Sequence, residues 1–474
     1  MKITTYMTTA KDSFDRFGDD LCQLLLQYFQ MDDRLRLQSV SKQWLALIFT
    51  TQTDLVFDDK LLKLFGMNSF FNKKQTLKLF KSIVKKCPNI TTVTINDFTA
   101  DYFKLLTNNK YCSRLTHISL NHNYYHYHNS YGKSFVLFCQ RFGQQLQTFK
   151  INGKSIKGGD ELFHKCIDSF RNLKTLDITT RDRSMGLDVI FADNKSYILP
   201  KTMQSLTLGL DNNFIKLFTK FTDIYGQQIK SLNLLVYDKL KDEHNFKTLT
   251  AGLSQMQQLK QLAISLPVDF GTDQTIQLLT TIGRRCRQVI EFSYTSKVSG
   301  IDLNKIFVSI AEHMSPQLRR LSVDCYHKYD EQFPLTSDSL KRLHRLTHLT
   351  LHVYNWLIIG DCFLSNLHRN LPRLQYIKCD YLSITQKSIT ALGQLAHLMD
   401  VYLLCDINKL KTSESFLTNH LVISSKYMKN LFITYWSSNE SKRFIYGKYL
   451  NDYNLNVNYR KRIFSSDSSS DKSY

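Results

Sequence analysis

Residues 318–323 read LRRLSV, and residues 346–351 read LTHLTL, the same apolar-x-x-apolar-x-apolar pattern 28 positions further on. The pattern occurs thirteen times, at intervals of 24 to 31 residues. The copies are ITTVTI (90–95), LTHISL (115–120), LQTFKI (146–151), LKTLDI (173–178), MQSLTL (203–208), IKSLNL (229–234), LKQLAI (259–264), VIEFSY (289–294), LRRLSV, LTHLTL, LQYIKC (374–379), LMDVYL (398–403) and MKNLFI (428–433). Self-similarity at such a period indicates a repeat architecture.

Each repeat combines a strand with a helix. The last two apolar positions of a copy lie two residues apart, which is the alternation of a β-strand. The segment 73–87, before the first copy, has apolar residues at helical spacing instead. These residues are Leu77, Phe80, Ile83, Val84 and Cys87. Stacked units of this kind give a parallel inner sheet with helices outside. A doubly wound α/β domain is the alternative, but its strands read as longer Val/Ile-rich runs without this regular spacing.

The thirteen copies resemble a leucine-rich repeat of the longer, helix-containing kind, over roughly residues 87–434. The resemblance implies an α/β solenoid with the shape of a horseshoe. Residues 51–86 are expected to form a linker and N-terminal cap, and residues 435–464 a C-terminal cap. We expect disorder in residues 1–13 and in the Ser-rich residues 465–474.

Composition limits the classes of protein that this chain can be. Of the 474 residues, 43% are hydrophobic and 12% aromatic, which excludes wholesale disorder. The ten cysteines have no CxxC pair, so we expect buried, reduced thiols. The first residues lack the apolar core of a signal peptide, and no apolar run reaches 18 residues. A cytoplasmic or nuclear protein that does not enter the membrane is expected.

The net charge of +21 does not fall on the predicted inner wall. The third, fifth and seventh positions of each repeat should face that wall, and among these thirty-nine positions three are basic and five acidic. The basic ones are Lys150, Arg320 and Lys378, and the acidic ones are Asp177, Glu291, Asp324, Asp380 and Asp400. The wall charge is therefore 3 − 5 = −2, and the excess of Lys and Arg belongs to helices, loops and ends. Nucleic acid in the groove is not expected, because phosphate binding needs basic residues along its path.

The segment 15–47, DRFGDDLCQLLLQYFQMDDRLRLQSVSKQWLAL, carries more apolar side chains than three short helices can bury among themselves. Asp19 and Asp20 favour a helix start, Asp32 or Asp33 could cap a second helix, and Ser41 could cap a third. The apolar residues are Phe17, Leu21, Leu24, Leu25, Phe29, Leu35, Leu37, Val40 and Trp44. We predict a three-helix module at residues 14–50 that offers an apolar surface to another protein.

The order of these residues resembles an F-box. The resemblance implies that the nine apolar residues dock on a Skp-type adaptor and, through it, on a cullin. It also implies that the repeats bind a target protein, since an F-box followed by leucine-rich repeats is a known family layout. The family usually has Leu-Pro where this chain has Phe17-Gly18. Glycine lacks the fixed φ of proline, so weaker adaptor binding is expected. A module that merely caps the solenoid is the alternative.

No pattern in the sequence supports catalysis, a cofactor or a metal. Neither GxGxxG nor GxxxxGK[ST] occurs, and no serine or cysteine nucleophile stands in a recognisable context. His122, His126 and His128 lie close together, but their Asn-, Tyr- and Ser-rich surroundings favour a loop between repeats. We therefore expect a protein that is not an enzyme.

The sequence and the resemblance lead to a non-catalytic substrate-recognition subunit of an SCF-type ubiquitin ligase. One alternative is a leucine-rich-repeat scaffold outside ubiquitylation, and another is an RNA-binding protein that uses its basic exterior. The late repeats have the most chemically distinctive wall, so the target is expected to bind there. The residues expected to contact it are Arg320, His348, Tyr376, Lys378, Asp400 and Tyr402.

Overall fold

The computed structural model describes most of the chain between residues 18 and 447. The described residues are 18–29, 31–67, 73–96, 98–108, 112–122, 132–153, 166–180, 199–210, 215–237, 243–267, 270–296, 301–314, 317–325, 334–353, 359–383, 385–406, 416, 420–421, 427–436 and 441–447. They form two compact units. The first unit comprises residues 1–221 and 228–235, and the second comprises residues 222–227 and 236–474.

Both units are built on sheets of short strands in chain order. The first unit contains β1 (Asp54–Phe57), β2 (Thr92–Asn96), β3 (His117–His122), β4 (Thr148–Gly153), β5 (Thr175–Thr180), β6 (Ser205–Leu210) and β7 (Ser231–Val236). The second contains β8 (Gln261–Leu266), β9 (Glu291–Ser296), β10 (Arg320–Cys325), β11 (His348–Val353), β12 (Ile359–Gly360), β13 (Tyr376–Ser383), β14 (Asp400–Asp406), β15 (Asn430–Trp436) and β16 (Ser441–Gly447). The described pairings are parallel, except that β16 runs antiparallel to β15. The short β12 lies off this order and pairs with β13.

These strands confirm the predicted repeat. Each of the thirteen sequence copies corresponds to one of β2 to β11 and β13 to β15, and each strand begins at the third residue of its copy. The first residue of the copy is buried in twelve repeats, and only Met428 is half-buried. Three strands, β1, β12 and β16, have no counterpart among the copies.

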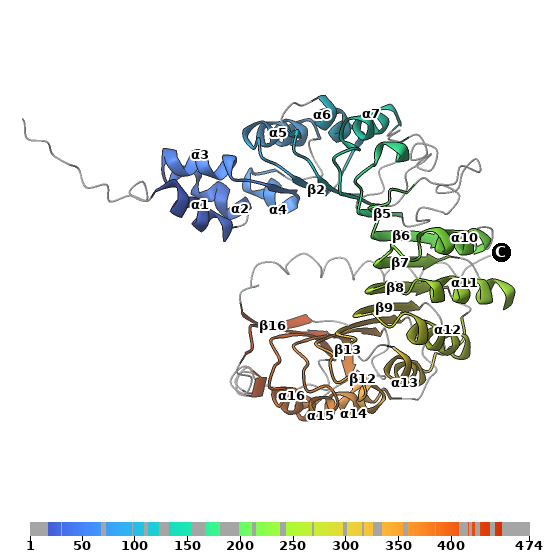
Figure 1. Cartoon of the computed structure of the whole chain (residues 1–474). Coiled ribbons are helices and arrows are strands. Elements are labelled where there is room, and N and C mark those ends of the chain that lie inside the picture. Colours follow the sequence, from blue (N-terminus) through green and yellow to red (C-terminus); the bar gives the residue numbers. More distant parts are fainter. Residues whose placement is uncertain are drawn as a thin grey trace, which may run out of the picture. The chain divides into compact units, whose positions relative to one another are not determined.

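Helices connect the strands and lie on one face of them in each unit (Figure 1). The chain begins with α1 (Asp19–Gln27), α2 (Met31–Arg36), the 3-10 helix η2 (Leu37–Ser39), α3 (Lys42–Thr50) and α4 (Asp59–Leu64). The repeats add α5 (Lys73–Lys86), α6 (Ala100–Asn108), α7 (Gly132–Phe142), η4 (Ile167–Ser169), α10 (Ile215–Tyr225), α11 (Glu243–Gln255), α12 (Thr272–Arg285), α13 (Leu303–His313), η6 (Ser337–Leu340), α14 (Asp361–Leu364), α15 (Leu367–Asn370) and α16 (Gln386–Gly393). Before β11 the described residues contain the 3-10 helix η6 instead of the expected α-helix.

One backbone contact recurs at the start of nearly every strand. The carbonyl of the second residue of a copy accepts two N–H groups from the next repeat. The Ile290 carbonyl, for example, accepts the N–H groups of Arg319 and Arg320 at 2.8 and 3.1 Å. The Arg319 carbonyl accepts those of Thr347 and His348 at 2.8 and 3.0 Å. Because both donors are backbone groups, this double contact fixes the register of neighbouring strands whatever the side chains are.

The two units have cores of different composition. In the first, the space between helices and strands is filled by aromatic rings in mutual contact. Phe57 meets Phe80 at a centroid distance of 5.1 Å, Phe80 meets Tyr102 at 5.1 Å, and Phe103 meets Phe138 at 5.0 Å. In the second, fewer aromatic side chains are buried among the described residues, and Leu, Ile and Val predominate. The sequence pattern requires only apolar residues at these places, so it did not distinguish the two cores.

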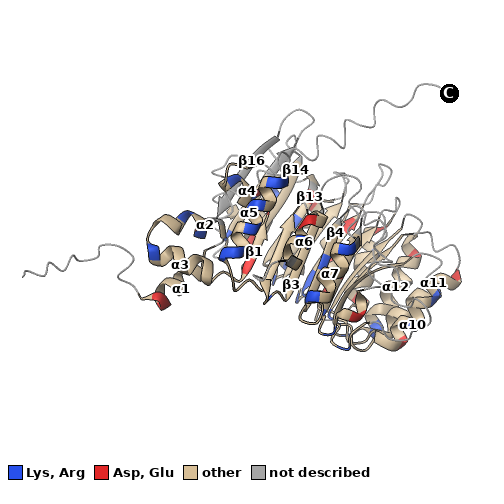
Figure 2. Ribbon diagram, turned by 90° about the horizontal axis from the view of Figure 1, so that it is seen from above, with Lys and Arg blue, Asp and Glu red and all other residues tan. Residues whose placement is uncertain are grey.

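The predicted amphipathic helix at 73–87 is α5. Phe80, Ile83 and Val84 are buried, while the lysines of this helix are exposed. Figure 2 shows basic residues along α5 and on α7. In this part of the molecule, therefore, the positive charge lies on the helices, as the sequence predicts.

Gly283 is a point where α12 and α13 approach too closely for a side chain. A methyl group there would lie 1.9 Å from the carbonyl oxygen of His313, whereas one at Gly271 would meet nothing within 4 Å. We expect Gly283→Ala to lower the free energy of unfolding by about 1–3 kcal/mol through overpacking, and Gly271→Ala to change it by about 0.5 kcal/mol or less. Thermal unfolding of the two variants beside the parent checks this; equal melting temperatures would contradict it.

Candidate functional site

The first candidate surface is the helical module of α1, α2, η2 and α3. One local cap and one contact between helices order it. The Ser41 hydroxyl accepts the N–H of Trp44 at 3.2 Å, so Ser41 caps α3 as predicted. Gln43 donates to the Asp19 carboxylate at 2.6 Å and joins α3 to α1. The predicted cap of the second helix by Asp32 or Asp33 is wrong, because α2 already begins at Met31.

Many apolar residues of the module are buried, and one of them, Phe49, faces α5, where Lys86 Nζ lies 5.0 Å from its ring centroid. The buried apolar residues of the module are Cys22, Leu26, Met31, Leu35, Trp44, Leu47, Ile48 and Phe49. Leu35 and Trp44 were expected on the adaptor surface, and the structure places both inside instead. Trp44 is only 3% exposed, because α3 turns this side of its helix inward. Phe17 lies outside the described residues.

A buried arginine ties the module to Gln52, two residues before β1. The Arg34 guanidinium donates from Nε to the Phe29 carbonyl at 3.0 Å and from Nη1 to Gln52 Oε1 at 2.9 Å. Burial lowers the pKa of Arg34, and the nearby Asp54 carboxylate opposes that shift. α2 also contacts α4. The module is therefore fastened to the body of the first unit through charged and polar contacts that the sequence did not reveal.

The exposed face of the module is apolar. Leu21, Leu24 and Tyr28 are 42%, 49% and 81% exposed, and their spacing of three and four residues puts them on one side of α1. Phe29, Val40 and Leu45 are also exposed, and Leu25 and Leu37 are half-buried. Six of the eleven large exposed apolar residues of the described chain thus belong to this module.

The second candidate surface is the wall formed by the strands of the second unit. In β9 to β11 the third, fifth and seventh residues of the copies are half-exposed or, at Arg320, exposed, and the residues between them are buried. On β13 the seventh residue, Asp380, is buried. Register places wall residues of the same position side by side: Arg320, His348, Tyr376 and Asp400 are partners on β10, β11, β13 and β14. All six predicted target-contact residues lie on these four adjacent strands.

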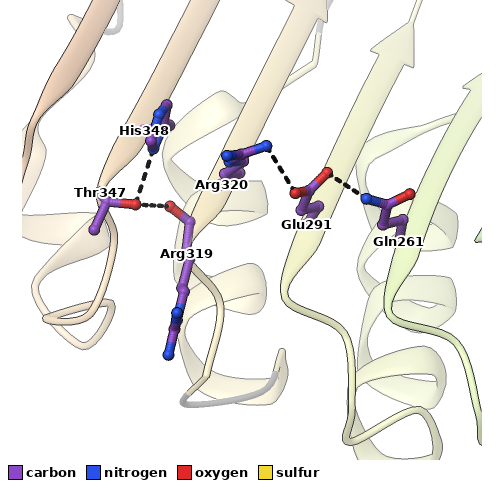
Figure 3. Close-up of polar contacts among 6 residues, drawn as sticks. All are labelled: Gln261, Glu291, Arg319, Arg320, Thr347 and His348. Carbon is purple, nitrogen blue, oxygen red and sulfur yellow. Dashed lines mark hydrogen bonds and ion pairs between the residues drawn. The ribbon is translucent and has the colours of Figure 1, made fainter. Parts of the chain in front are cut away.

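One end of this row is an ion-pair chain. Arg320 Nη1 donates to Glu291 Oε1 at 2.9 Å, and Gln261 Nε2 donates to the other oxygen of Glu291 at 3.0 Å (Figure 3). His348 follows on the next strand, where its Nδ1 lies 2.9 Å from the Thr347 hydroxyl. Burial lowers the pKa of His348, as does Arg320, while Asp400 and Glu291 oppose the shift.

From His348 onward the wall is aromatic. The His348 and Tyr376 rings are stacked at 5.5 Å, the Tyr376 and Tyr402 rings lie 5.5 Å apart, and the Tyr402 and Phe432 rings 6.3 Å apart. These four side chains come from β11, β13, β14 and β15 and are half-exposed. Phe432 was missed as a site residue, although its place at the fifth position of the last copy could have predicted it.

Two carboxylates and an imidazole meet at the carboxyl ends of β10, β11 and β13. Asp324, His352 and Asp380 are partners in register, and His352 Nδ1 lies 2.6 Å from Asp380 Oδ2. Burial raises the pKa of Asp324, and Asp380 raises it further, while His352 acts in the opposite direction. This corner of the wall thus holds a carboxylate in surroundings that disfavour its charge.

The cysteines lie mostly in the core, as expected. All ten are free thiols, and nine of them are buried. Burial is the main cause that raises the pKa values of Cys87, Cys112 and Cys286 to about 12, so they are unreactive. Within the described part of the chain, no group of three or more His, Cys, Asp or Glu residues could hold a metal ion, and no helix is long and apolar enough to cross a membrane. His126 and His128 lie outside that part.

No protein-family model matches this chain, and no curated protein matches it in sequence. Among solved structures, the chain is similar to an internalin from Listeria monocytogenes, with 12% identity, a TM-score of 0.34, and coverage of 76% of this chain and 89% of that one. It is similar to the Rad7 and Elc1 complex in yeast, with 12% identity, a TM-score of 0.39, and coverage of 87% and 92%. TLR13 in complex with ssRNA13 matches with 12% identity and a TM-score of 0.30 over 81% of this chain and 43% of that one.

Gly18 has a backbone conformation that proline could adopt. Its φ is −64° and its ψ is 159°, and a methyl group there would meet nothing within 4 Å. Proline fixes φ near −65°. We therefore expect Gly18→Pro to stabilise the module by about 0.4–1 kcal/mol, because it restricts the unfolded chain. Amide hydrogen exchange over residues 19–50 measures the effect.

Gly66 supplies the matched control for this substitution. It follows α4 with a φ of +66°, and its N–H donates to the Lys63 carbonyl at 3.0 Å. Proline can supply neither this angle nor this donor, so Gly66→Pro should destabilise the first unit. Faster exchange in residues 19–50 of Gly18→Pro than in the parent would refute the prediction.

Proposed function

We propose that this chain is the non-catalytic substrate-recognition subunit of an SCF-type ubiquitin ligase. In this proposal, the helical module docks a Skp-type adaptor that connects it to a cullin, and the repeat wall binds the protein to be ubiquitylated. The observation that carries the proposal is the exposed apolar face of the module, formed by Leu21, Leu24 and Tyr28 on α1. Such a subunit accelerates a reaction by positioning its target and needs no reactive group of its own.

Burial of the exposed apolar side chains against a partner protein would lower the free energy. Full burial of a Leu side chain contributes about 1.5–3 kcal/mol. Leu21 and Leu24 are close to half exposed and Tyr28 more so. Covering the three therefore adds about 3 kcal/mol, enough for the centre of a protein interface when polar groups at the rim exclude water.

The module can hold a bound adaptor in a fixed position on the first unit. Its core is separate from the exposed face, since Leu35, Trp44 and Ile48 are buried. Arg34 holds it to Gln52, two residues before β1. An adaptor bound to α1 would therefore be attached to the first unit through the contacts of the module. Changes to the exposed leucines should not unfold the module, because these side chains lie outside the buried set.

The leading alternative is a leucine-rich-repeat scaffold that binds protein outside ubiquitylation. It predicts no adaptor complex and full function after removal of residues 15–49. RNA binding through the basic helices predicts retention on a nucleic-acid column that disappears between low and moderate salt. Adaptor binding by the parent chain distinguishes both alternatives from the proposal.

We expect Leu21→Asp and Leu24→Asp each to weaken adaptor binding about tenfold or more, because a carboxylate would be trapped in an apolar contact. Co-expression with a Skp-type adaptor, followed by calorimetric titration of the purified partners, measures the affinity. Leu137→Asp is the matched control: Leu137 is also a helical leucine, is 45% exposed, and lies on α7 away from the module.

The three variants should have the same melting temperature within about 2 °C, since none of these side chains is in a core. The proposal fails if the parent forms no complex with the adaptor. It also fails if Leu137→Asp weakens the complex as much as the module variants do.

A further inference from the structure

The wall of the second unit joins two kinds of side chain that together recognise cations. His348, Tyr376, Tyr402 and Phe432 form a continuous row of half-exposed rings across β11, β13, β14 and β15. Ring faces attract ammonium and guanidinium groups, most strongly where water is partly excluded. The row runs across four strands. An extended polypeptide that lies across the same strands would therefore pass over each ring in turn.

Carboxylates flank this aromatic row on both sides. Asp400 is the register partner of Tyr376, and Asn430 Nδ2 donates to its Oδ1 at 2.5 Å. On the other side lie Asp380 on β13 and Asp324 on the neighbouring β10, with His352 of β11 between them. A cation lying over the rings could therefore reach the half-exposed Asp400 directly, whereas only 12% of the Asp380 side chain is exposed and its Oδ2 lies 2.6 Å from His352 Nδ1.

The charge of this wall is opposite to that of the chain. Arg320 is paired with Glu291, so the two charges cancel. Over the remaining wall positions of β10 to β14 one lysine, Lys378, stands against Asp324, Asp380 and Asp400, which gives 1 − 3 = −2. The protein as a whole carries +21. An acidic wall on so basic a protein is the charge complement of a basic partner.

The surroundings of Asp324 also favour a cationic ligand. Its Oδ1 is buried and has no hydrogen-bond partner in the structure. Burial and the neighbouring Asp380 raise the pKa of Asp324, and His352 only partly compensates. An ammonium or guanidinium group brought next to Asp324 and Asp380 would stabilise both charges with charge-assisted hydrogen bonds.

We propose that the wall of β10 to β15 binds an extended polypeptide segment rich in Lys and Arg, whose cationic side chains lie on the aromatic row and pair with Asp380 and Asp400. The inference rests on the proposed function in one respect, that the repeat wall is the target-binding surface. It adds the chemistry of the target. Lys378, in the middle of the wall, then faces the segment's backbone carbonyls or an acidic residue between its basic ones.

The experiment uses the full chain and a fluorescent twelve-residue peptide of three Gly-Ser-Lys-Arg repeats. Fluorescence anisotropy gives its affinity, and a peptide with Gln at each Lys and Arg position is the uncharged comparison. Because a lost charge-assisted contact costs about tenfold in affinity, Asp380→Asn and Asp400→Asn should each weaken binding of the basic peptide about tenfold. Tyr402→Ala should weaken it severalfold. The Gln peptide should bind at least tenfold more weakly to the parent.

Asp177→Asn is the matched control. Asp177 is a half-exposed wall carboxylate on β5 in the first unit, so this variant removes the same charge from the same kind of position. It should bind the peptide as the parent does. Equal losses in Asp177→Asn and Asp400→Asn would show a diffuse charge effect and overturn the inference, as would no binding of the basic peptide. A single-stranded RNA that binds the wall and is lost in Lys378→Gln would overturn it too.

The adaptor assay separates this inference from the proposed function. Asp380→Asn and Asp400→Asn should bind the Skp-type adaptor normally, and Leu24→Asp should bind the basic peptide normally. If the adaptor binds but the peptide does not, the charge of the target is wrong and the receptor role stands. If the peptide binds but the adaptor does not, the wall is right and the receptor role falls.

Discussion

The structure depends on one repeated backbone contact, in which the carbonyl of a copy's second residue accepts two N–H groups from the next repeat. At nearly every step it fixes where the following strand begins, so that strands such as β9, β10 and β11 start level with one another. The alternation of the strand then sends every second side chain to the helices and the others to the wall. The backbone alone thus decides which positions face the core and which face the wall. The wall residues are free to carry the binding chemistry because the fold does not need them.

The repeat could be predicted from the sequence in detail, and the physical reason is the period itself. Thirteen short apolar patterns, each weak alone, reinforce one another when their spacing is regular. The wall residues followed directly, since register partners such as Arg320 and His348 occupy the same position of successive copies. The contacts between wall side chains could not be predicted from the sequence. The stacking of His348 on Tyr376 and the pairing of Arg320 with Glu291 depend on side-chain rotamers, which a pattern of apolar and polar letters does not contain.

In the helical module, the composition predicted an exposed apolar surface, but the sequence did not predict which apolar side chains point inward. The excess of apolar residues was recognisable, and Leu21 and Leu24 are indeed exposed. Leu35 and Trp44 could not be assigned, because three short helices have several ways to share one small core. The choice is made partly by Arg34, whose buried guanidinium bonds to the Phe29 carbonyl and to Gln52. A charged residue in a core contradicts the usual expectation for its type, and nothing in its local sequence marks it.

The reversed direction of β16 has a consequence for assembly. A stack of parallel strands ends in a row of unpaired backbone groups that invites another chain to add on, with fibres as the extreme result. Where β15 would leave such a template, β16 pairs with it antiparallel and closes it to a further parallel repeat. Pairing with β16 therefore occupies the edge of β15 on which a further parallel strand would otherwise form.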